Sequence, residues 1–255
     1  MYQLVNASFE IDGKMILPPI SLTFEPGKVT TLLGHNGCGK STLIKLLSRQ
    51  NTPTQGEVFF DERLLSTFSN LELAHQVAYL PQHPPITDGV TVRELVSFGR
   101  YPWKGAFGRY SEKDHAIIDE AIQKVGLSDF SDRFVATLSG GERQRAWVAM
   151  LLAQQSRCIL LDEPTSALDV AHQYELLALI RELNQSLGLT VIMVLHDVNM
   201  AATFSDHLIA LHSGKVIASG SPQHLMTPET LMRIYGMEIA LFPHPETGQP
   251  ISYIP

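Results

Sequence analysis

Gly34-His35-Asn36-Gly37-Cys38-Gly39-Lys40-Ser41 decides the fold, because it matches the phosphate-loop pattern G-x-x-x-x-G-K-[ST]. Val29-Thr30-Thr31-Leu32-Leu33, which has the pattern of a buried strand, precedes it, and apolar residues at helical spacing follow it from Ser41 to Ser48. A buried strand, a glycine-rich loop and a helix, in this order, form the context that the motif requires. The stretch therefore predicts an α/β fold of the P-loop class.

The loop is expected to hold the phosphates of a nucleotide. Its glycines let several backbone N–H groups point inward, and the following helix adds its positive N-terminal end. Lys40 supplies a charge for the β- and γ-phosphates, and the Ser41 hydroxyl is a ligand for Mg²⁺. The same dipoles and Lys40 are expected to lower the pKa of the Cys38 thiol, so that thiol reagents inactivate the protein. The residues assigned to ATP in this segment are Gly34, His35, Asn36, Gly37, Cys38, Gly39, Lys40, Ser41 and Thr42.

Further strand and helix patterns surround the loop. Loose alternation at 2–9, a turn at Asp12-Gly13 and a second run at 21–24 predict a β region near the start. A hairpin is predicted around Ser213-Gly214, between the runs 208–211 and 216–218. Strands are predicted at 56–60 and 77–80, buried strands at 158–161 and 191–195, and a helix at 174–187.

The segment 84–157 has a different character. It contains no strand pattern, and Pro84-Pro85 and Thr87-Asp88-Gly89 interrupt the chain. Helices are predicted at 92–98 and 111–125, with a loop at 100–110. We therefore expect one domain over 1–255, with a core made of 1–83 and 158–255 and an inserted helical subdomain at 84–157.

The composition excludes several classes of protein. The chain has 255 residues, with 19 Lys and Arg against 26 Asp and Glu, so its formal net charge is −7. Nucleic acid is not an expected partner, because contacts to phosphate backbones need an excess of basic residues. The longest apolar run, Ala146 to Ala153, is too short to span a bilayer, and the first residues lack the pattern of a secretory signal. Two cysteines without a CxxC spacing fit a reducing compartment.

Two carboxylates, Asp162 and Glu163, follow the apolar run 158–161. At the C-terminal end of a buried strand beside the P-loop, Asp162 is placed to contact Mg²⁺. Glu163 is then placed to polarise the water that attacks the γ-phosphate. The alternative is that both are solvated residues at a strand end, where carboxylates are common.

The turn Ser139-Gly140-Gly141-Glu142 precedes a long helical pattern. Ser139 and Glu142 have the spacing of an ordinary capping box, which needs no ligand. The two glycines also expose N–H groups at the positive end of a helix, so the turn is a second phosphate-binding site in the functional interpretation. Since the P-loop already holds one face of the nucleotide, we expect two copies of the chain to enclose ATP between them.

Three further polar residues are candidates for the same site. Gln82 follows the run 77–80, and its amide would reach Mg²⁺ or the attacking water. His196 follows 191–195 and would sense the γ-phosphate and hold Glu163 in place. Asp169 fits a contact between subunits or a simple helix start. Single polar residues at such positions are more often plain surface, so none of the three is decisive alone.

Together, these motifs resemble the ATP-binding cassette ATPases in order and spacing, over nearly the whole chain. The most specific part is Leu138-Ser139-Gly140-Gly141 ahead of the Asp-Glu strand. The resemblance implies a RecA-like core with an antiparallel β edge and a helical subdomain. It also implies a Q-loop residue, a catalytic base, a D-loop residue and a switch histidine, which are Gln82, Glu163, Asp169 and His196, and a catalytic role for Lys40.

Several stretches resemble, more narrowly, the ATPases of iron-siderophore and vitamin B12 importers. Gly99-Arg100-Tyr101-Pro102-Trp103 and Phe242-Pro243-His244-Pro245 are two of them. This resemblance implies ATP and Mg²⁺ as cofactors and a homodimer bound peripherally at the cytoplasmic face of the inner membrane. It implies an integral membrane permease docked near 84–110 and, indirectly, a periplasmic or surface substrate-binding protein. Ferric hydroxamate is the expected cargo, and another iron chelate, heme or vitamin B12 is the alternative.

Two rival interpretations remain at this point. A soluble cassette ATPase of ribosomes or DNA repair usually has paired cassettes or basic extensions, which this acidic chain lacks. A nucleotide-sensing module without hydrolysis would not need Glu163 and His196.

One position departs from the family pattern. Many members place an aromatic residue in the first β region to stack on adenine, and the matching residue here is Ile11. We expect Ile11 to give the base apolar contact with less stacking.

Overall fold

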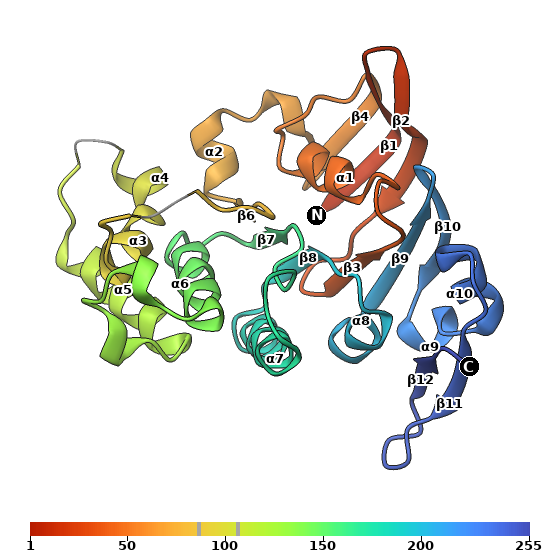
Figure 1. Ribbon diagram of the computed structural model, residues 1–255. Coiled ribbons are helices and arrows are strands. Elements are labelled where there is room, and N and C mark those ends of the chain that lie inside the picture. The colour runs from red at the N-terminus through yellow and green to blue at the C-terminus, as the bar shows by residue number, and fades with distance from the viewer. Residues whose placement is uncertain (86–87, 106–107) are drawn as a thin grey trace.

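The computed structural model describes residues 1–85, 88–105 and 108–255, and a six-stranded sheet lies at its centre (Figure 1). The strand order is β10-β9-β3-β8-β7-β6, and only the β9–β10 pair is antiparallel. β3, β7 and β8 are buried along their whole length, as expected for parallel strands covered on both faces. The α/β prediction is confirmed. The strands are β3 (Val29–Leu33), β6 (Val77–Leu80), β7 (Cys158–Leu161), β8 (Thr190–Val194), β9 (His207–His212) and β10 (Lys215–Gly220).

A four-stranded antiparallel sheet with the order β2-β1-β4-β5 forms the predicted β edge. Its first strands make a longer hairpin than the sequence pattern indicates, because β2 begins at Lys14 and runs through Pro18 and Pro19. Proline removes a hydrogen-bond donor, but β2 is an edge strand, where that loss is tolerated. The strands are β1 (Tyr2–Ile11), β2 (Lys14–Thr23), β4 (Gln55–Phe60) and β5 (Arg63–Leu64).

Helix α1 (Lys40–Leu47) joins the two sheets into one core. Its Leu43 and Leu47 are fully buried and belong to the same apolar cluster as Leu4 of β1 and Leu32 of β3. The amphipathic pattern after the P-loop thus predicts the correct helix to within one residue at each end. Beyond α1, the 3₁₀ turn at Leu65–Thr67 and α2 (Asn70–Ala74) lead into β6.

The opposite face of the six-stranded sheet is covered by α7 (Val170–Leu187) and α8 (Val198–Phe204) (Figure 1). The sequence pattern places the start of α7 at 174, but the helix begins at Val170 because Asp169 caps it. The C-terminal segment was not predicted in detail. It contains α9 (Pro222–Leu225), α10 (Pro228–Tyr235) and a separate hairpin of β11 (Ala240–Pro243) and β12 (Pro250–Tyr253).

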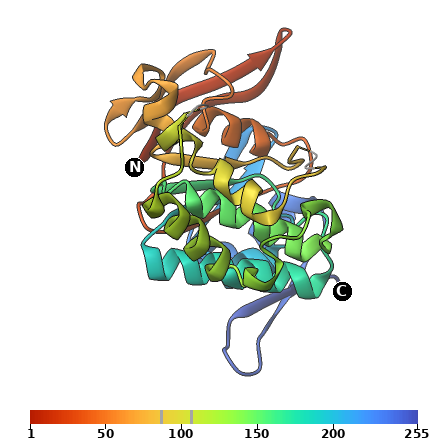
Figure 2. The same ribbon diagram turned by 90° about the vertical axis from the view of Figure 1, so that its left-hand side faces the viewer.

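The chain between β6 and β7 is helical in its described parts, as Figure 2 shows from the side of this insert. The prediction of a loop at 100–110 is partly wrong, because Pro102 lies in the first turn of a short helix. Positions 106 and 107 of that loop, and Thr87 of the predicted interruption, lie outside the described residues. Within those residues, no helix combines the length and apolarity needed to cross a membrane. The helices are α3 (Val92–Phe98), α4 (Tyr101–Lys104), α5 (Glu112–Lys124) and α6 (Gly140–Ala153), with 3₁₀ turns at Ser128–Phe130 and Val135–Thr137.

A buried charge cluster ties these helices together. Asp114 of α5 pairs with Arg100, with 3.1 Å between Oδ1 and Nε, and with Lys104, with 2.6 Å between Oδ2 and Nζ. Arg100 also donates from Nη1 to the carbonyl of Ala153 at the end of α6, at 2.8 Å. Since Arg100 and Asp114 are both buried, these bonds replace the water that each charge lost on folding.

Candidate nucleotide-binding site

The P-loop connects β3 to α1 through backbone conformations that favour glycine. Gly34, Gly37 and Gly39 have φ of 147°, 78° and 103°. A Cβ atom at Gly34 would lie 2.3 Å from the carbonyl oxygen of Leu211, so the loop packs directly on the end of β9. His35, Asn36 and Gly37 are exposed, which leaves the outer side of the loop open to a ligand.

Lys40 shows that this loop suits an anion. The side chain is 4% exposed, and its Nζ donates to the carbonyl oxygens of Gly34 at 2.8 Å and His35 at 3.0 Å. In the described parts of the chain it forms no ion pair with a carboxylate. A buried ammonium group without a counterion is costly, and triphosphate oxygens would supply the missing negative charge.

Asp162 and Ser41 meet at the C-terminal ends of the sheet. The Ser41 hydroxyl donates to Oδ1 of Asp162 at 2.9 Å, although the two residues are 121 positions apart. Burial raises the pKa of the Asp162 carboxyl, and the bond from Ser41 only partly opposes that effect. A buried carboxylate beside a hydroxyl presents the hard oxygen ligands that Mg²⁺ prefers, so the donor set fits the ion.

Glu163 contacts side chains that follow two other strands of the sheet. Its Oε2 accepts a hydrogen bond from Gln82 Nε2 at 2.6 Å and lies 2.9 Å from Nε2 of His196. The three residues follow β7, β6 and β8. Glu163 itself has a φ of 52°, a left-handed conformation that is uncommon for a residue with a side chain.

A cavity of 480 Å³ lies over these groups. The structure therefore brings most of the predicted P-loop residues together with Gln82 and Glu163. The residues that line the cavity are Ile16, Asn36, Gly37, Gly39, Lys40, Ser41, Thr42, Gln82 and Glu163.

The turn at 139–142 has, within one chain, the geometry of a capping box. Ser139 N donates to Glu142 Oε2 at 2.8 Å, and Glu142 N donates to Ser139 Oγ at 3.3 Å. The capping box does not decide between the two interpretations, because it satisfies only some of the N–H groups that the first turn of a helix leaves without a partner. Gly140 lines a second cavity of 480 Å³, which shares Gln82 and Glu163 with the first.

The same turn packs on the residues that follow Glu163. A Cβ atom at Gly141 would lie 2.6 Å from Cδ2 of His172 in α7. Asp169 accepts the backbone N–H of His172 at 3.0 Å, and its Oδ1 lies 2.8 Å from the ring Nδ1. Asp169 is therefore the N-cap of α7 and, at the same time, indirectly linked to the 139–142 turn; its expected contact with a second subunit stays a prediction.

The expectation that the pKa of Cys38 is lowered is wrong, and inactivation by thiol reagents stays a prediction. The side chain is 1% exposed, and burial raises the pKa of the thiol, which outweighs the opposing effect of Lys40. The sequence shows the charge and the N–H dipoles beside Cys38, but it does not show that the side chain points into the core under the loop.

Ile11 and Ile16 lie differently from the expectation for adenine. Ile11 ends β1, is 53% exposed and is not among the residues that line the P-loop cavity, so its role stays a prediction. Ile16 of β2 does line that cavity, and the sequence analysis missed it. The pairing of Phe9 with Leu17 brings Ile16 to this position, and that register was not readable from the sequence.

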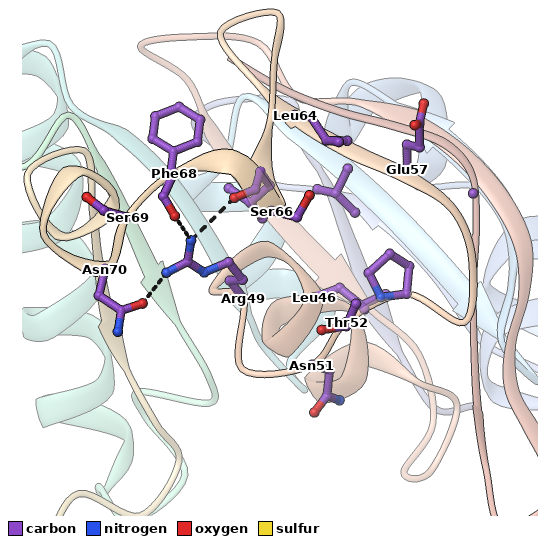
Figure 3. Close-up of a pocket in the computed structure, with 14 residues that line it drawn as sticks. Leu46, Arg49, Asn51, Thr52, Glu57, Leu64, Ser66, Phe68, Ser69 and Asn70 are labelled. Carbon is purple, nitrogen blue, oxygen red and sulfur yellow. Dashed lines mark hydrogen bonds between the residues drawn. The ribbon is translucent and has the colours of Figure 1, made fainter.

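A larger cavity than the one over the P-loop lies elsewhere. It has a volume of 760 Å³ and lies at the C-terminal end of α1, between β4 and α2 (Figure 3). Arg49 bridges this region by donating to the carbonyl of Phe68 and to Oδ1 of Asn70. None of the predicted site residues lines it, so cavity size alone does not identify the nucleotide site.

The loop, the strand-end carboxylates and their amide and imidazole partners define the class of P-loop nucleotide-binding proteins. A family model described as ABC transporter matches residues 17–166. The iron(3+)-hydroxamate import ATP-binding protein of Bacillus subtilis (strain 168) is 42% identical over 238 residues, which cover 93% of this chain and 88% of that protein. The ferric enterobactin transport ATP-binding protein of Escherichia coli (strain K12) is 42% identical over 232 residues, covering 91% and 86%.

Solved structures agree with this relationship. A metal-chelate type ABC transporter in an inward-facing conformation matches with a TM-score of 0.86 and 25% identity, covering 99% of this chain and 95% of that chain. The ATP-binding cassette MJ0796, a dimer in a post-hydrolysis state bound to ADP and Pi, matches with a TM-score of 0.75 and 28% identity, covering 87% and 99%. The chain belongs to the ATP-binding subunits of the ABC transporter family, as the motifs predict.

Proposed function

We propose that this chain is the ATP-hydrolysing subunit of an importer for a ferric siderophore, with ferric hydroxamate as the cargo. The observation that carries the catalytic part is the convergence of Gln82 and His196 on Glu163 beside the P-loop. The importer part rests on the relatives named above, one of which is a hydroxamate import protein. Another iron chelate, heme or vitamin B12 is the alternative cargo, since no residue of an ATPase subunit contacts the cargo itself.

The proposed chemistry assigns one task to each group. The ammonium of Lys40 and the loop N–H groups bind the β- and γ-phosphates, and Glu163 orients the water for in-line attack. Imidazole Nε2 of His196 lies within hydrogen-bond reach of Glu163 and supports its orientation. Mg²⁺, held by Ser41, Asp162 and Gln82, would neutralise charge on the phosphates.

The complete site would need a second copy of the chain. We propose that Ser139, Gly140, Gly141 and Glu142 of one subunit contact the triphosphate held by the P-loop of the other, with Asp169 at the same interface. The start of α6 at Gly140 supports this assignment, because the first N–H groups of a helix have no partner within the helix, and so does the dimeric state of the related cassette MJ0796.

The partner in the membrane would be a permease. We propose residues 84–157 as the helical subdomain and the stretch near 84–110 as its docking surface. Phe98, Tyr101 and Trp103 are 52%, 59% and 45% exposed, and such a group of large apolar side chains favours a protein contact. The chain would then lie peripherally at the cytoplasmic face of the inner membrane and meet the substrate-binding protein only through the permease.

Substitution at Glu163 tests the catalytic part. Purified Glu163→Gln is expected to bind ATP while its rate of phosphate release falls at least ~10²-fold, because loss of one well-aimed group typically costs 10²–10³ in rate. Lys40→Ala should lose ATP binding as well, and Glu182→Gln, a change of the same kind on the outer part of α7, is the control. Near-normal hydrolysis by Glu163→Gln would remove Glu163 from this role.

A membrane pull-down tests the transport part. The tagged chain should co-purify with a polytopic membrane protein from detergent extracts. In vesicles that contain this complex and a binding protein, ferric hydroxamate should stimulate hydrolysis more than a ferric catecholate or vitamin B12 does. Co-sedimentation with ribosomes instead of membranes would contradict the transport function.

A further inference from the structure

The loop that carries His196 is short, and it is anchored at both ends, by a backbone hydrogen bond from Leu195 to Leu32 of β3 at 3.3 Å and by Asp197, which caps α8. It runs from the end of β8 at Val194 to the start of α8 at Val198. The His196 side chain is 42% exposed and reaches across to Glu163. The orientation of the imidazole also depends on what holds the carbonyl of His196, which lies between these two anchors.

Tyr235 contacts this loop at His196 itself. Its hydroxyl donates to the carbonyl oxygen of His196 at 3.3 Å. Tyr235 is the last residue of α10, which Leu231 and Ile234, both 1% exposed, anchor in the core. Burial raises the pKa of Tyr235 to about 12, so the hydroxyl remains a donor at every pH where the protein is expected to work.

A second contact holds the helix that follows His196. Asn199 of α8 donates from Nδ2 to the carbonyl of Ser252 at 3.0 Å and accepts the N–H of Ser252 on Oδ1 at 2.8 Å. The pair of bonds docks β12 of the C-terminal hairpin onto α8 (Figure 1). Two separate parts of the segment after β10, the end of α10 and the strand β12, therefore bond to the His196 loop and to α8.

We propose that Tyr235 is a positioning residue for hydrolysis, which acts on Glu163 through His196, and that the hairpin of β11 and β12 supports it through Asn199. The inference rests on the proposed function, because His196 has a catalytic consequence only if ATP is hydrolysed here. Its physical content is that the C-terminal segment sets the rate of the chemical step and has little effect on the affinity for ATP.

The test compares Tyr235→Phe with Tyr253→Phe. Tyr235→Phe removes one hydroxyl and is expected to lower kcat about three- to tenfold, with KM for ATP changed less than about twofold, because one neutral hydrogen bond is lost away from the phosphates. Tyr253→Phe makes the same chemical change on the C-terminal hairpin, where no bond to its hydroxyl occurs in the described structure, and should keep the wild-type kcat.

A double substitution separates positioning from a general loss of structure. In a His196→Ala background, Tyr235→Phe should have no further effect on the slow residual rate, because the hydroxyl acts through the imidazole. An equal fold-loss in both backgrounds, or an unchanged kcat in Tyr235→Phe alone, would overturn the proposal. If Tyr235→Phe does not fold, Asn199→Asp, which loses the bond to the Ser252 carbonyl, should show the same kcat-specific loss, and its absence overturns the proposal equally.

The wild-type protein distinguishes this inference from the proposed function. If the wild type releases no phosphate from ATP, the proposed function fails. If the wild type does release phosphate and Tyr235→Phe has the same kcat, the positioning role fails while the proposed function stands.

Discussion

Asp114 in the helical insert and Asp162 at the end of β7 are equally buried, each 3% exposed, and yet their electrostatic surroundings are opposite. Burial raises the pKa of Asp114, but hydrogen bonds from Lys104, Ser111 and Arg100 outweigh it and hold the pKa well below its ordinary value. Asp162 has the Ser41 hydroxyl as its one hydrogen-bond donor in the described structure, and burial keeps its pKa raised.

The difference separates a charge used for structure from a charge kept for a ligand. Asp114 already has its cations, so its negative charge stabilises the insert. In the described parts of the chain, Asp162 has no cation and Lys40 no carboxylate at ion-pair distance. In the proposed function, Mg²⁺ and the triphosphate would supply these charges. Functional sites are commonly less stable than the rest of a fold for this reason.

The largest expected effect is on turnover at Asp162. Asp162→Asn keeps the size of the side chain and loses the charge, so phosphate release should fall by about 10²–10³-fold, as for other charge-stabilising groups. Steady-state hydrolysis across a range of Mg²⁺ concentrations measures this. Asp114→Asn, provided that it is assayed at a temperature where it is folded, should keep most of the activity. Equal losses of activity in Asp162→Asn and Asp114→Asn would contradict the different roles assigned to the two carboxylates.

The next effect is on stability at Asp114. Asp114→Asn leaves Arg100 and Lys104 without their carboxylate, and breaking a buried ion pair in this way costs about 3–5 kcal/mol. Urea unfolding at pH 7 measures it. Asp119→Asn on the same helix removes an exposed partner of Arg93 and should change the free energy of unfolding by less than about 1 kcal/mol. A cost below that of the control would show that the buried cluster is not stabilising.

A smaller effect of opposite sign is expected for the stability of Asp162→Asn. Because the folded pKa is raised, the folded state binds a proton more readily than the unfolded state, and stability falls as pH rises through that window. Above that window the whole penalty applies, so the variant should then be more stable than wild type and have the higher Tm. Well below pH 3.8, both states are protonated and the advantage should vanish. Thermal unfolding at several pH values checks the sign, and a variant whose advantage in Tm shrinks as the pH rises would contradict it.

The smallest effect concerns Cys38, a third buried group in the site. Because burial outweighs the charge of Lys40, the thiol should react with a disulfide reagent at pH 8 at least ~10-fold more slowly than a free thiol such as glutathione. The measurement is the rate at which the reagent's coloured thiolate appears, followed by its absorbance over minutes to hours. If Cys38 were labelled rapidly and ATP prevented the labelling, the prediction of a reactive thiol made from the sequence would be correct after all.

The sequence is sufficient for the parts of this molecule in which local pattern and chemistry agree. The P-loop, the apolar strands and the carboxylates at 162 and 163 are contiguous motifs, and they predict both the α/β core and the edge of the sheet that holds the site. Contacts between distant segments were not predictable in the same way. The register of β1 and β2 places Ile16 at the cavity, and the packing under the loop buries Cys38.

The C-terminal segment shows the same limit. No sequence motif marks Tyr235 or Asn199. Tyr235 is important because it bonds to the backbone carbonyl of His196, and Asn199 because it bonds to the backbone of β12. Such contacts depend on tertiary packing and not on local periodicity.

Light scattering of Glu163→Gln with and without Mg-ATP tests most directly whether two chains enclose the nucleotide. The variant should double its mass when ATP and Mg²⁺ are present and return to a monomer with ADP. Glu163→Gln combined with Ser139→Arg should bind ATP and remain a monomer, since the altered turn would face the other copy in the proposed dimer. A Glu163→Gln protein that binds ATP at full occupancy and stays monomeric would contradict the shared site.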